Sequence, residues 1–270
     1  MDRIIEEDFL EEIDKAISRL SGKKYVNIDF KNAVVIGDTH GDFLSLKAIL
    51  ERISREGIIF LGDYGDRGHY GVATYYEILR LLNERENVVL LRGNHESDAV
   101  IPHELPTQFK AYFESDAPLN RLRDFWEKLP ISAGSEDYWF VHGGVPTGGR
   151  KYRDDFSERD VLKPSDEDAV EMLWNDPWER EENGHNYLRG VMYFFGKKTT
   201  KAFLRELGFK VIIRSHQPNK ILVAEQDGMV VTVGSCMEPY RLNEAAFLRI
   251  DLTERIKNGY DVVKNFGVFI

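Results

Sequence analysis

Five short loops of the sequence carry histidine, aspartate or asparagine, and four of the seven histidines lie in them. The loops read Asp38-Thr39-His40-Gly41-Asp42, Asp63-Tyr64-Gly65-Asp66-Arg67-Gly68, Asn94-His95-Glu96, His142-Gly143-Gly144 and Arg214-Ser215-His216. Asp38 and His40 are two positions apart, so in an extended segment both side chains project to the same side, as two ligands of one metal ion do. A single histidine is more often structural than a ligand, so the interpretation rests on the five loops occurring together.

The chemistry of these side chains indicates a metal centre suited to phosphorus. Imidazole, carboxylate and carboxamide ligands without thiolate suit manganese, iron or zinc better than calcium or copper(I). Two such ions about 3.5–4 Å apart can share one solvent molecule and clamp an in-line displacement at phosphorus. Metal coordination lowers the pKa of water from about 16 to about 7, which provides a hydroxide nucleophile near neutral pH. Hydrolysis at such a centre needs no side-chain nucleophile.

Each of the five loops follows a short apolar run that predicts a buried strand. The runs span residues 33–36, 58–61, 88–91, 138–141 and 211–213. Helical patterns at 43–55 and 70–85 separate the first three runs, which indicates an α/β fold. In open α/β sheets, ligands bind beyond the carboxyl ends of the strands, where these loops begin. Two further apolar runs around Asp227-Gly228 predict a hairpin within 220–233, so the sheets are expected to be mixed.

Length and composition narrow the class of protein. With 270 residues, 42% hydrophobic and 30% charged, the chain fits one α/β domain, 1–270. Residues 1–30 are expected to form an N-terminal helical packing segment and residues 31–250 the catalytic core. The single cysteine, Cys236, excludes a disulfide framework and a thiolate metal cluster, and it is expected to be a small buried residue.

The net charge and the hydropathy of the sequence indicate which partners and which cellular location to expect. The net charge of −10 disfavours nucleic-acid partners, which require clustered Lys and Arg. No apolar run of about 18 residues predicts a membrane span. The acidic, interrupted N-terminal segment is unlike a secretory signal, so the expected location is the cytoplasm.

Three of the motifs together resemble the signatures of the serine/threonine phosphoprotein phosphatase (PPP) family, within the calcineurin-like metallophosphoesterase fold. They are Gly37-Asp38-Thr39-His40-Gly41, Gly62-Asp63-Tyr64-Gly65-Asp66-Arg67-Gly68 and Gly93-Asn94-His95-Glu96. Further likeness is carried by Leu129-Pro130 before His142-Gly143-Gly144, by Leu173-Trp174-Asn175-Asp176-Pro177, by Arg189-Gly190-Val191 and by Arg214-Ser215-His216-Gln217. The resemblance implies a central sandwich of two mixed β-sheets flanked by helices, whereas periodicity alone indicates only mixed α/β.

The resemblance also implies a set of metal ligands. Two divalent ions, expected to be manganese with iron or zinc as alternatives, would be held by Asp38, His40, Asp63, Asn94, His142 and His216. Within that set Asp38 and His40 would bind the first ion, Asp63 would bridge both, and the other three would bind the second. A metal-bridging hydroxide would attack phosphorus.

Five residues are implied to act on the substrate. Arg67 and Arg189 would bind the phosphoryl oxygens through their guanidinium forks, next to Asn94 and His95. His95 would also be the general acid that protonates the leaving alkoxide. Asp66 would orient His95, as a carboxylate orients histidine in other sites.

Two positions depart from the family pattern. Gly65 stands where the family usually has valine, which predicts a looser loop because glycine gives up side-chain packing and adds conformational freedom. After Ser235 the family continues Ala-Pro-Asn-Tyr, whereas this chain reads Cys236-Met237-Glu238-Pro239-Tyr240. Tyr240 is therefore the candidate for the substrate-facing tyrosine, displaced in register. His69, next to the second motif, is expected to lie outside the site.

Three functions are consistent with these motifs. The first is a protein phosphatase that acts on phosphoserine and phosphothreonine in phosphoproteins, with some activity on phosphotyrosine left open. The alternative is a hydrolase of dinucleoside polyphosphates such as diadenosine tetraphosphate, which shares two of the motifs; the intact Asp66-Arg67-Gly68 favours the phosphatase. The third is an inactive scaffold that binds phosphoproteins, and it is disfavoured because every expected ligand is present.

Overall fold

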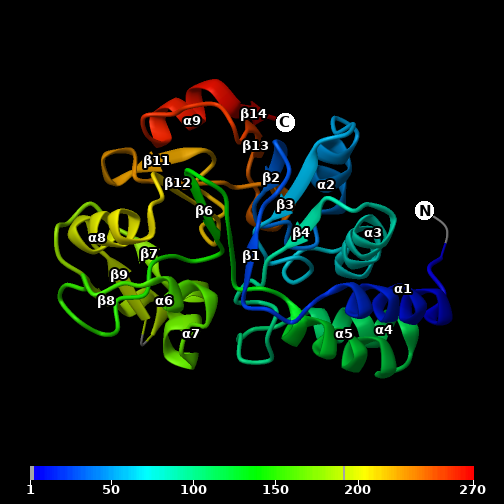
Figure 1. Cartoon of the computed structure of the whole chain (residues 1–270). Coiled ribbons are helices and arrows are strands. Elements are labelled where there is room, and N and C mark those ends of the chain that lie inside the picture. The colour runs from blue at the N-terminus through cyan, green and yellow to red at the C-terminus, as the bar shows by residue number, and fades with distance from the viewer. Residues whose placement is uncertain (1–2, 191) are drawn as a thin grey trace.

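Two β-sheets packed face to face form the centre of the molecule in this computed structural model, which describes residues 3–190 and 192–270 (Figure 1). One sheet has the strand order β1-β5-β6-β10-β12-β11. Its strands are β1 (Tyr25–Asn27), β5 (Ser132–Gly134), β6 (Tyr138–Val141), β10 (Val211–Arg214), β12 (Val230–Thr232) and β11 (Val223–Glu225). Neighbours β6, β10 and β12 are parallel, whereas β5 pairs with β6, and β11 with β12, antiparallel. The predicted hairpin within 220–233 is therefore confirmed.

The other sheet has the order β14-β13-β2-β3-β4. Its strands are β14 (Gly267–Phe269), β13 (Ala246–Asp251), β2 (Asn32–Ile36), β3 (Gly57–Phe60) and β4 (Val88–Leu90). The pairs β2–β3 and β3–β4 are parallel, and β13 joins β2 and β14 antiparallel. Both sheets are thus mixed, as the sequence predicted. Strands β1 and β14 lie outside the span 31–250 and add an edge to each sheet.

Helices cover the outer faces of the two sheets (Figure 1). Beside the β14–β4 sheet lie α1 (Glu6–Arg19), α2 (Phe43–Leu50), α3 (Gly71–Glu84), α4 (Leu105–Phe113) and α5 (Ala117–Lys128). Beside the β1–β11 sheet lie α6 (Glu158–Leu162), α7 (Asp166–Trp174), α8 (Lys197–Leu207) and a small sheet of β7 (Asp176–Pro177), β9 (Met192–Phe195) and β8 (Gly184–Asn186). The remaining elements are α9 (Gly259–Phe266) and the 3₁₀ turns η1 (Tyr187–Arg189), η2 (Gln226–Gly228) and η3 (Glu238–Tyr240).

Alternation along the strands explains the layers. In β2, Val35 packs in the cluster between the sheets, whereas Val34 and Ile36 pack in the cluster under the helices. In β3, Ile59 joins the inter-sheet cluster and Phe60 the helix-side cluster. Successive side chains of a strand point to opposite faces, so apolar residues at every position suit a strand that is buried on both faces. The same pattern that predicted these strands from sequence therefore builds a sandwich.

The N-terminal part of the chain contains the packing helix α1, followed by strand β1. α1 buries Phe9, Ile13 and Ala16 and contacts α3 and α5. The helix expected over 43–55 ends at Leu50, five residues early, because the chain turns there toward β3. Within residues 3–190 and 192–270, every helix is too short or too polar to cross a lipid bilayer.

Candidate metal and phosphate site

The predicted ligands come from the carboxyl ends of strands in both sheets. Asp38 and His40 follow β2, Asp63 follows β3 and Asn94 follows β4, whereas His142 and His216 follow β6 and β10 of the other sheet. An isolated parallel bridge between Asp38 and Gly234 links the two sheets beside the site. All six ligand candidates are buried. The sandwich therefore brings together every metal-ligand candidate that the sequence indicated.

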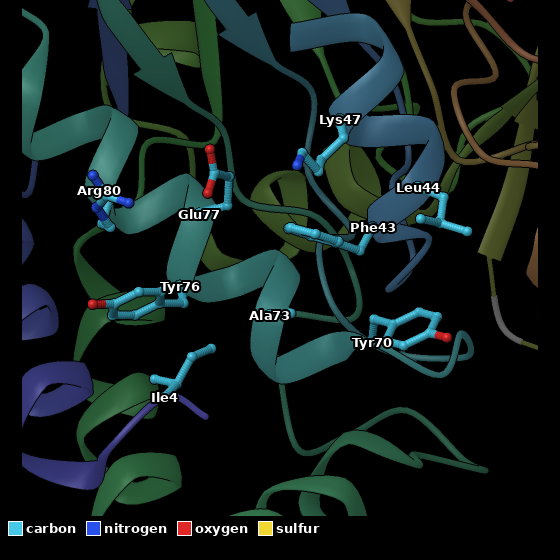
Figure 2. Close-up of a pocket in the computed structure, with 9 residues that line it drawn as sticks. All are labelled: Ile4, Phe43, Leu44, Lys47, Tyr70, Ala73, Tyr76, Glu77 and Arg80. Carbon is cyan, nitrogen blue, oxygen red and sulfur yellow. The ribbon is translucent and has the colours of Figure 1, made fainter. Parts of the chain in front are cut away.

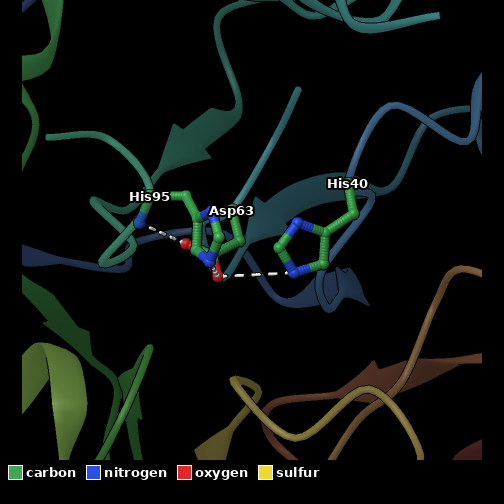
Figure 3. Close-up of side chains that lie close together, drawn as sticks. All are labelled: His40, Asp63 and His95. Carbon is green, nitrogen blue, oxygen red and sulfur yellow. Dashed lines mark hydrogen bonds and ion pairs between the residues drawn. The ribbon is translucent and has the colours of Figure 1, made fainter. Parts of the chain in front are cut away.

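Four of these candidates, together with His95, form two groups of potential ligands that share the Asp63 carboxylate. His40, Asp63 and His95 form one group, and Asp63, His142 and His216 form the other; within each group the potential ligand atoms lie within 4.8 Å of one another. Figure 3 shows His40 and His95 flanking the Asp63 side chain. A carboxylate common to both groups is the arrangement expected of a bridging ligand.

Backbone carbonyls fix the orientation of two histidines. His40 Nδ1 lies 3.1 Å from Asp66 O, so it donates to that carbonyl and leaves Nε2 directed at Asp63 Oδ2, 3.5 Å away. His142 Nδ1 likewise donates to Leu61 O at 2.9 Å. Its Nε2 then lies 3.2 Å from Asp63 Oδ2 and 2.9 Å from Asn94 Oδ1. Such hydrogen bonds set the tautomer that leaves the other nitrogen free to bind a metal.

Two buried atoms in this cluster have no hydrogen-bond partner among the described residues. They are Asp38 Oδ2 and His216 Nε2. Ser215 Oγ and the His216 N–H both bond to the other carboxylate oxygen of Asp38. A buried polar atom without a partner costs about 1–3 kcal/mol, and a bound cation removes that cost. The donor set of carboxylate, carboxamide and imidazole therefore fits divalent transition-metal ions.

The pKa values of the cluster suit cation binding. Burial raises the pKa of Asp63, but the neighbouring His142 and His95 outweigh burial and hold the pKa well below its usual value. Burial lowers the pKa of His216, and Arg189 lowers it further. Burial also lowers the pKa of His40. Burial lowers the pKa of His142 as well, but the Asp63 carboxylate outweighs burial and raises it. An ionised Asp63 with neutral His40 and His216 matches the protonation states in which carboxylate and imidazole bind metal, whereas His142 would release a proton on binding.

Backbone strain concentrates at the site. His40, Asp63, Arg67 and His216 adopt φ values of 44°, 57°, 84° and 66°. The left-handed region costs a non-glycine residue about 1–3 kcal/mol and persists where the surroundings hold it. The N–H groups of Thr39 and His40 both donate to Asp63 O, at 3.1 and 2.9 Å, which ties the first two loops together.

His95 and Asp66 form a hydrogen-bonded pair. His95 Nδ1 lies 2.6 Å from Asp66 Oδ2, and Nε2 lies 3.9 Å from Asp63 Oδ2. Burial raises the pKa of Asp66, but the hydrogen bond and the charge of His95 bring it down to about 2. Burial lowers the pKa of His95, but the carboxylates of Asp63 and Asp66 outweigh it and raise the pKa. The two carboxylates therefore favour the protonated form of the His95 ring, next to the ligand cluster.

A pocket of about 640 Å³ opens over the cluster. Its walls are His40, Asp63, Arg67, His95, Arg189, His216, Gln217, Pro218, Asn219, Tyr240 and Leu242. Both predicted phosphate-binding arginines therefore face the same space as the ligand groups. Burial raises the pKa of Tyr240, so its hydroxyl stays neutral, and its ring centroid lies 5.4 Å from that of His40.

Another cavity, of about 650 Å³, lies between α2 and α3 (Figure 2). Phe43 and Lys47 line it from α2, and Tyr76 and Arg80 line it from α3. None of the predicted site residues contributes to it. The two cavities have similar volumes, so volume does not identify the functional site. The potential metal ligands in the other cavity do.

Two carboxylates without a predicted role, Asp176 and Glu96, support the site. Asp176 Oδ2 accepts from Arg189 Nε at 3.1 Å, and Asp176 Oδ1 accepts from buried Arg214 Nη2 at 3.0 Å. Glu96 accepts hydrogen bonds from the N–H groups of Asp63 and Gly93, at 2.7 and 2.8 Å. Both residues lie inside the motifs, which could have indicated that they matter for the site. Most of their hydrogen-bond partners are distant in the sequence and could not be inferred from it.

The loop at Gly65 is packed and is not left loose. A Cβ built at Gly65 lies 2.5 Å from Tyr75 Cε2, so the Tyr75 ring fills the space that a larger residue at 65 would need. Tyr75 Oη donates to Glu96 Oε1 at 2.8 Å and accepts from Trp126 Nε1 at 3.0 Å. The expectation that glycine loosens this loop is therefore wrong, because the packing comes from α3.

Two other conspicuous residues lie where the sequence suggested. The His69 side chain is 79% exposed, does not line the pocket, and contacts Glu238. Cys236 is buried, and burial raises the pKa of its thiol well above the usual value. A thiol in that environment is a poor nucleophile because the thiolate is disfavoured.

Comparison with known proteins agrees with this geometry. A model of the calcineurin-like phosphoesterase family matches residues 32–220. The chain is 33% identical over 214 residues to serine/threonine-protein phosphatase T of Saccharomyces cerevisiae, which covers 74% of this chain and 41% of that protein. It is 34% identical over 216 residues to a probable serine/threonine-protein phosphatase of Encephalitozoon cuniculi, which covers 76% of this chain and 47% of that protein. The chain spans less than half the length of these two relatives.

Solved structures show the same fold. A protein serine/threonine phosphatase from Saccharomyces cerevisiae, described as similar to human phosphatase PP5, superposes with a TM-score of 0.77 at 26% identity. That match covers 92% of this chain and 83% of the other. A cold-active protein-tyrosine phosphatase of a psychrophilic Shewanella species has a TM-score of 0.59 at 15% identity over 84% of this chain and 77% of the other. The resemblance to the serine/threonine phosphoprotein phosphatase family and the calcineurin-like fold, both predicted from the motifs, are therefore confirmed.

Proposed function

The chain belongs to the calcineurin-like phosphoesterase family, and from that membership we propose that it is a protein phosphatase that hydrolyses phosphoserine and phosphothreonine with two divalent cations. The observation that carries the proposal is the pair of buried ligand groups that share Asp63 beneath a pocket lined by Arg67 and Arg189. Two positive guanidinium forks above a cation-binding cluster suit a phosphoryl group, which carries negative charge on its oxygens.

The metal ligands are assigned from the family motifs. Asp38 and His40 would hold the first ion, Asn94, His142 and His216 would hold the second, and Asp63 would serve both. His95 also lies within ligand distance of His40 and Asp63, but its role is proton transfer. The unpartnered atoms Asp38 Oδ2 and His216 Nε2 support this assignment. When bound, the two ions supply Lewis acidity at the phosphoryl oxygens and lower the pKa of water toward neutrality. Manganese is the expected metal, with iron or zinc as alternatives.

The chain's own side chains orient and protonate the substrate. Arg189 is held by Asp176 and, through Nη2, by His216 O at 3.2 Å, so its guanidinium is fixed at the pocket wall. Arg67 lies on the opposing loop that also carries Asp63. With Nδ1 bound to Asp66, His95 keeps the proton on Nε2 available for the leaving oxygen of serine or threonine. We further propose that residues 1–270 act as one phosphatase domain located in the cytoplasm.

The function is tested by parallel assays and metal analysis. The purified chain, loaded with manganese, is assayed on a panel of phosphoserine, phosphothreonine and phosphotyrosine peptides and on diadenosine tetraphosphate. Metal content is measured on the same sample by mass spectrometry. Turnover of the phosphoserine or phosphothreonine peptides with two ions per chain is the expected result. Preferential turnover of diadenosine tetraphosphate replaces the proposal with the alternative hydrolase, and no turnover with bound metal indicates a scaffold.

A further inference from the structure

Asp42 accepts hydrogen bonds from two separate parts of the chain. Asp42 Oδ1 accepts from the Ser45 N–H at 3.1 Å, which caps the N-terminus of α2. Asp42 Oδ2 accepts from Ser45 Oγ at 2.6 Å and from the backbone N–H groups of Met237 and Glu238 at 2.7 and 3.1 Å. The Asp42 side chain is 3% exposed. A helix cap needs one oxygen, so the second oxygen is available to bind the segment that follows Ser235.

The segment bound by Asp42 forms one wall of the catalytic pocket. Residues 236–242, called here the tyrosine loop, contain the 3₁₀ turn η3 and contribute Tyr240 and Leu242 to the pocket. Besides Asp42, the loop is held by the buried Cys236 and by the Tyr240 ring, which lies beside that of His40. Its polar side-chain contact is that of Glu238 with His69, and both of those side chains are exposed. An exposed pair holds a loop weakly, whereas hydrogen bonds to a buried carboxylate are among the stronger neutral-to-charged bonds.

We propose that Asp42 is a positioning residue that holds the tyrosine loop against the site and thereby places Tyr240 beside the substrate phosphate. The inference rests on the proposed phosphatase function and adds a determinant to it. Asp42 does not line the pocket. Its effect on the reaction is exerted through the loop, because the N–H groups it binds stand three and two residues before Tyr240.

Two variants separate the loop contact from the helix cap. Asp42→Ser keeps an N-cap oxygen for the Ser45 N–H but is too short to reach the loop as well. Ser45→Ala is the matched control, since it removes one hydrogen bond of the same carboxylate and leaves the two bonds to the loop. Asp42→Asn is a second test variant if Asp42→Ser does not fold, because an amide offers one acceptor oxygen in place of two.

The first readout is hydrogen exchange of the tyrosine loop, measured by mass spectrometry on the metal-loaded protein. Asp42→Ser is expected to speed exchange of the Met237 and Glu238 amides by about tenfold or more, the lower limit for losing a hydrogen bond to a charged acceptor. Ser45→Ala is expected to change it by less than about twofold. Unchanged exchange in Asp42→Ser, or equal acceleration in both variants, overturns the proposal. This measurement needs no activity, so it stands even if the proposed function fails.

The second readout is a double-mutant cycle with Tyr240→Ala on a phosphoserine peptide. Asp42→Ser is expected to lower kcat/KM by about tenfold or more in the wild-type background, because small misplacements of a contacting group are costly. In the Tyr240→Ala background the same change is expected to lower kcat/KM by less than about twofold. Equal losses in both backgrounds mean that Asp42 acts independently of Tyr240 and overturn the proposal.

Discussion

Both oxygens of the Asp66 carboxylate are engaged, one by His95 Nδ1 at 2.6 Å and the other by the N–H groups of Glu104 and Leu105 at 2.7 and 3.1 Å. The carboxylate is therefore fixed from two sides, and it fixes the His95 ring in turn. With Nδ1 committed to Asp66, Nε2 is the atom presented to the pocket. This geometry makes His95 the group best placed to give a proton to a departing oxygen.

The role of His95 predicts a dependence on the leaving group. His95→Asn is expected to lower kcat for a phosphoserine peptide by about 10²–10⁴-fold, the range for loss of a general acid. An activated aryl phosphate needs little protonation, so its kcat is expected to fall far less. The measurement is kcat for both substrates at saturating metal. Equal losses for the two substrates would show that His95 does not act as the acid.

The shared position of Asp63 predicts that it matters more than Asp38. Asp63→Asn is expected to reduce kcat at least on the order of tenfold more than Asp38→Asn, because only Asp63 belongs to both ligand groups. Rates are compared at saturating metal, so that weaker metal affinity is not mistaken for slower chemistry. Metal content of each variant is the control. Losses of the same size would argue against a bridging role.

Chelation is predicted to destabilise the protein. The buried atoms Asp38 Oδ2 and His216 Nε2 have no hydrogen-bond partner in the described part of the chain, so a cation bound there stabilises the folded state. At a free metal concentration 100 times Kd the stabilisation is about 2.7 kcal/mol, which corresponds to roughly 5–10 °C in Tm. Thermal unfolding with a chelator and with added manganese measures this difference. In His216→Ala the manganese effect is expected to shrink; an unaltered Tm on metal removal contradicts the site.

Gly65 and Tyr75 are predicted to be energetically coupled. Gly65→Ala places a Cβ within 2.5 Å of Tyr75 Cε2 and is expected to cost about 1–3 kcal/mol of stability by overpacking. Tyr75→Leu makes room, so the cost of Gly65→Ala is expected to be smaller in that background, with a coupling of about 0.5–3 kcal/mol. Denaturant unfolding of the four proteins gives the cycle. Strict additivity would mean that the ring does not fill the space at position 65.

Cys236 is predicted to have no chemical role. Cys236→Ser is expected to keep most of the wild-type kcat, at a stability cost of about 1–2 kcal/mol for burying a hydroxyl in place of a thiol. Rapid acid quench during turnover is expected to trap no phosphorylated residue. A phosphorylated enzyme, or an inactive Cys236→Ser protein that retains its metals, would point to a covalent mechanism.

The local elements and the chemistry of the site followed from the sequence by itself. Apolar runs of four residues or so, ended by glycine and a polar loop, marked β2, β3, β4, β6 and β10 because strand formation depends on nearby residues. Since the carboxyl ends of such strands collect ligands, the residue types in the loops were enough to indicate a metal centre. Helix ends were less exact, as at Leu50, because they depend on where the chain must turn.

Only the tertiary structure decided which residues support one another. Asp42 and Glu238 are 196 positions apart and Ser215 and Asp38 are 177 apart, yet both pairs are hydrogen-bonded. The sequence likewise suggested a loose loop at Gly65, and the Tyr75 ring from α3 corrects that view. Such contacts depend on strand order, on the left-handed backbone at His40 and Asp63, and on which face each helix presents. Local periodicity carries none of that information, because it describes neighbours along the chain and not across the sandwich.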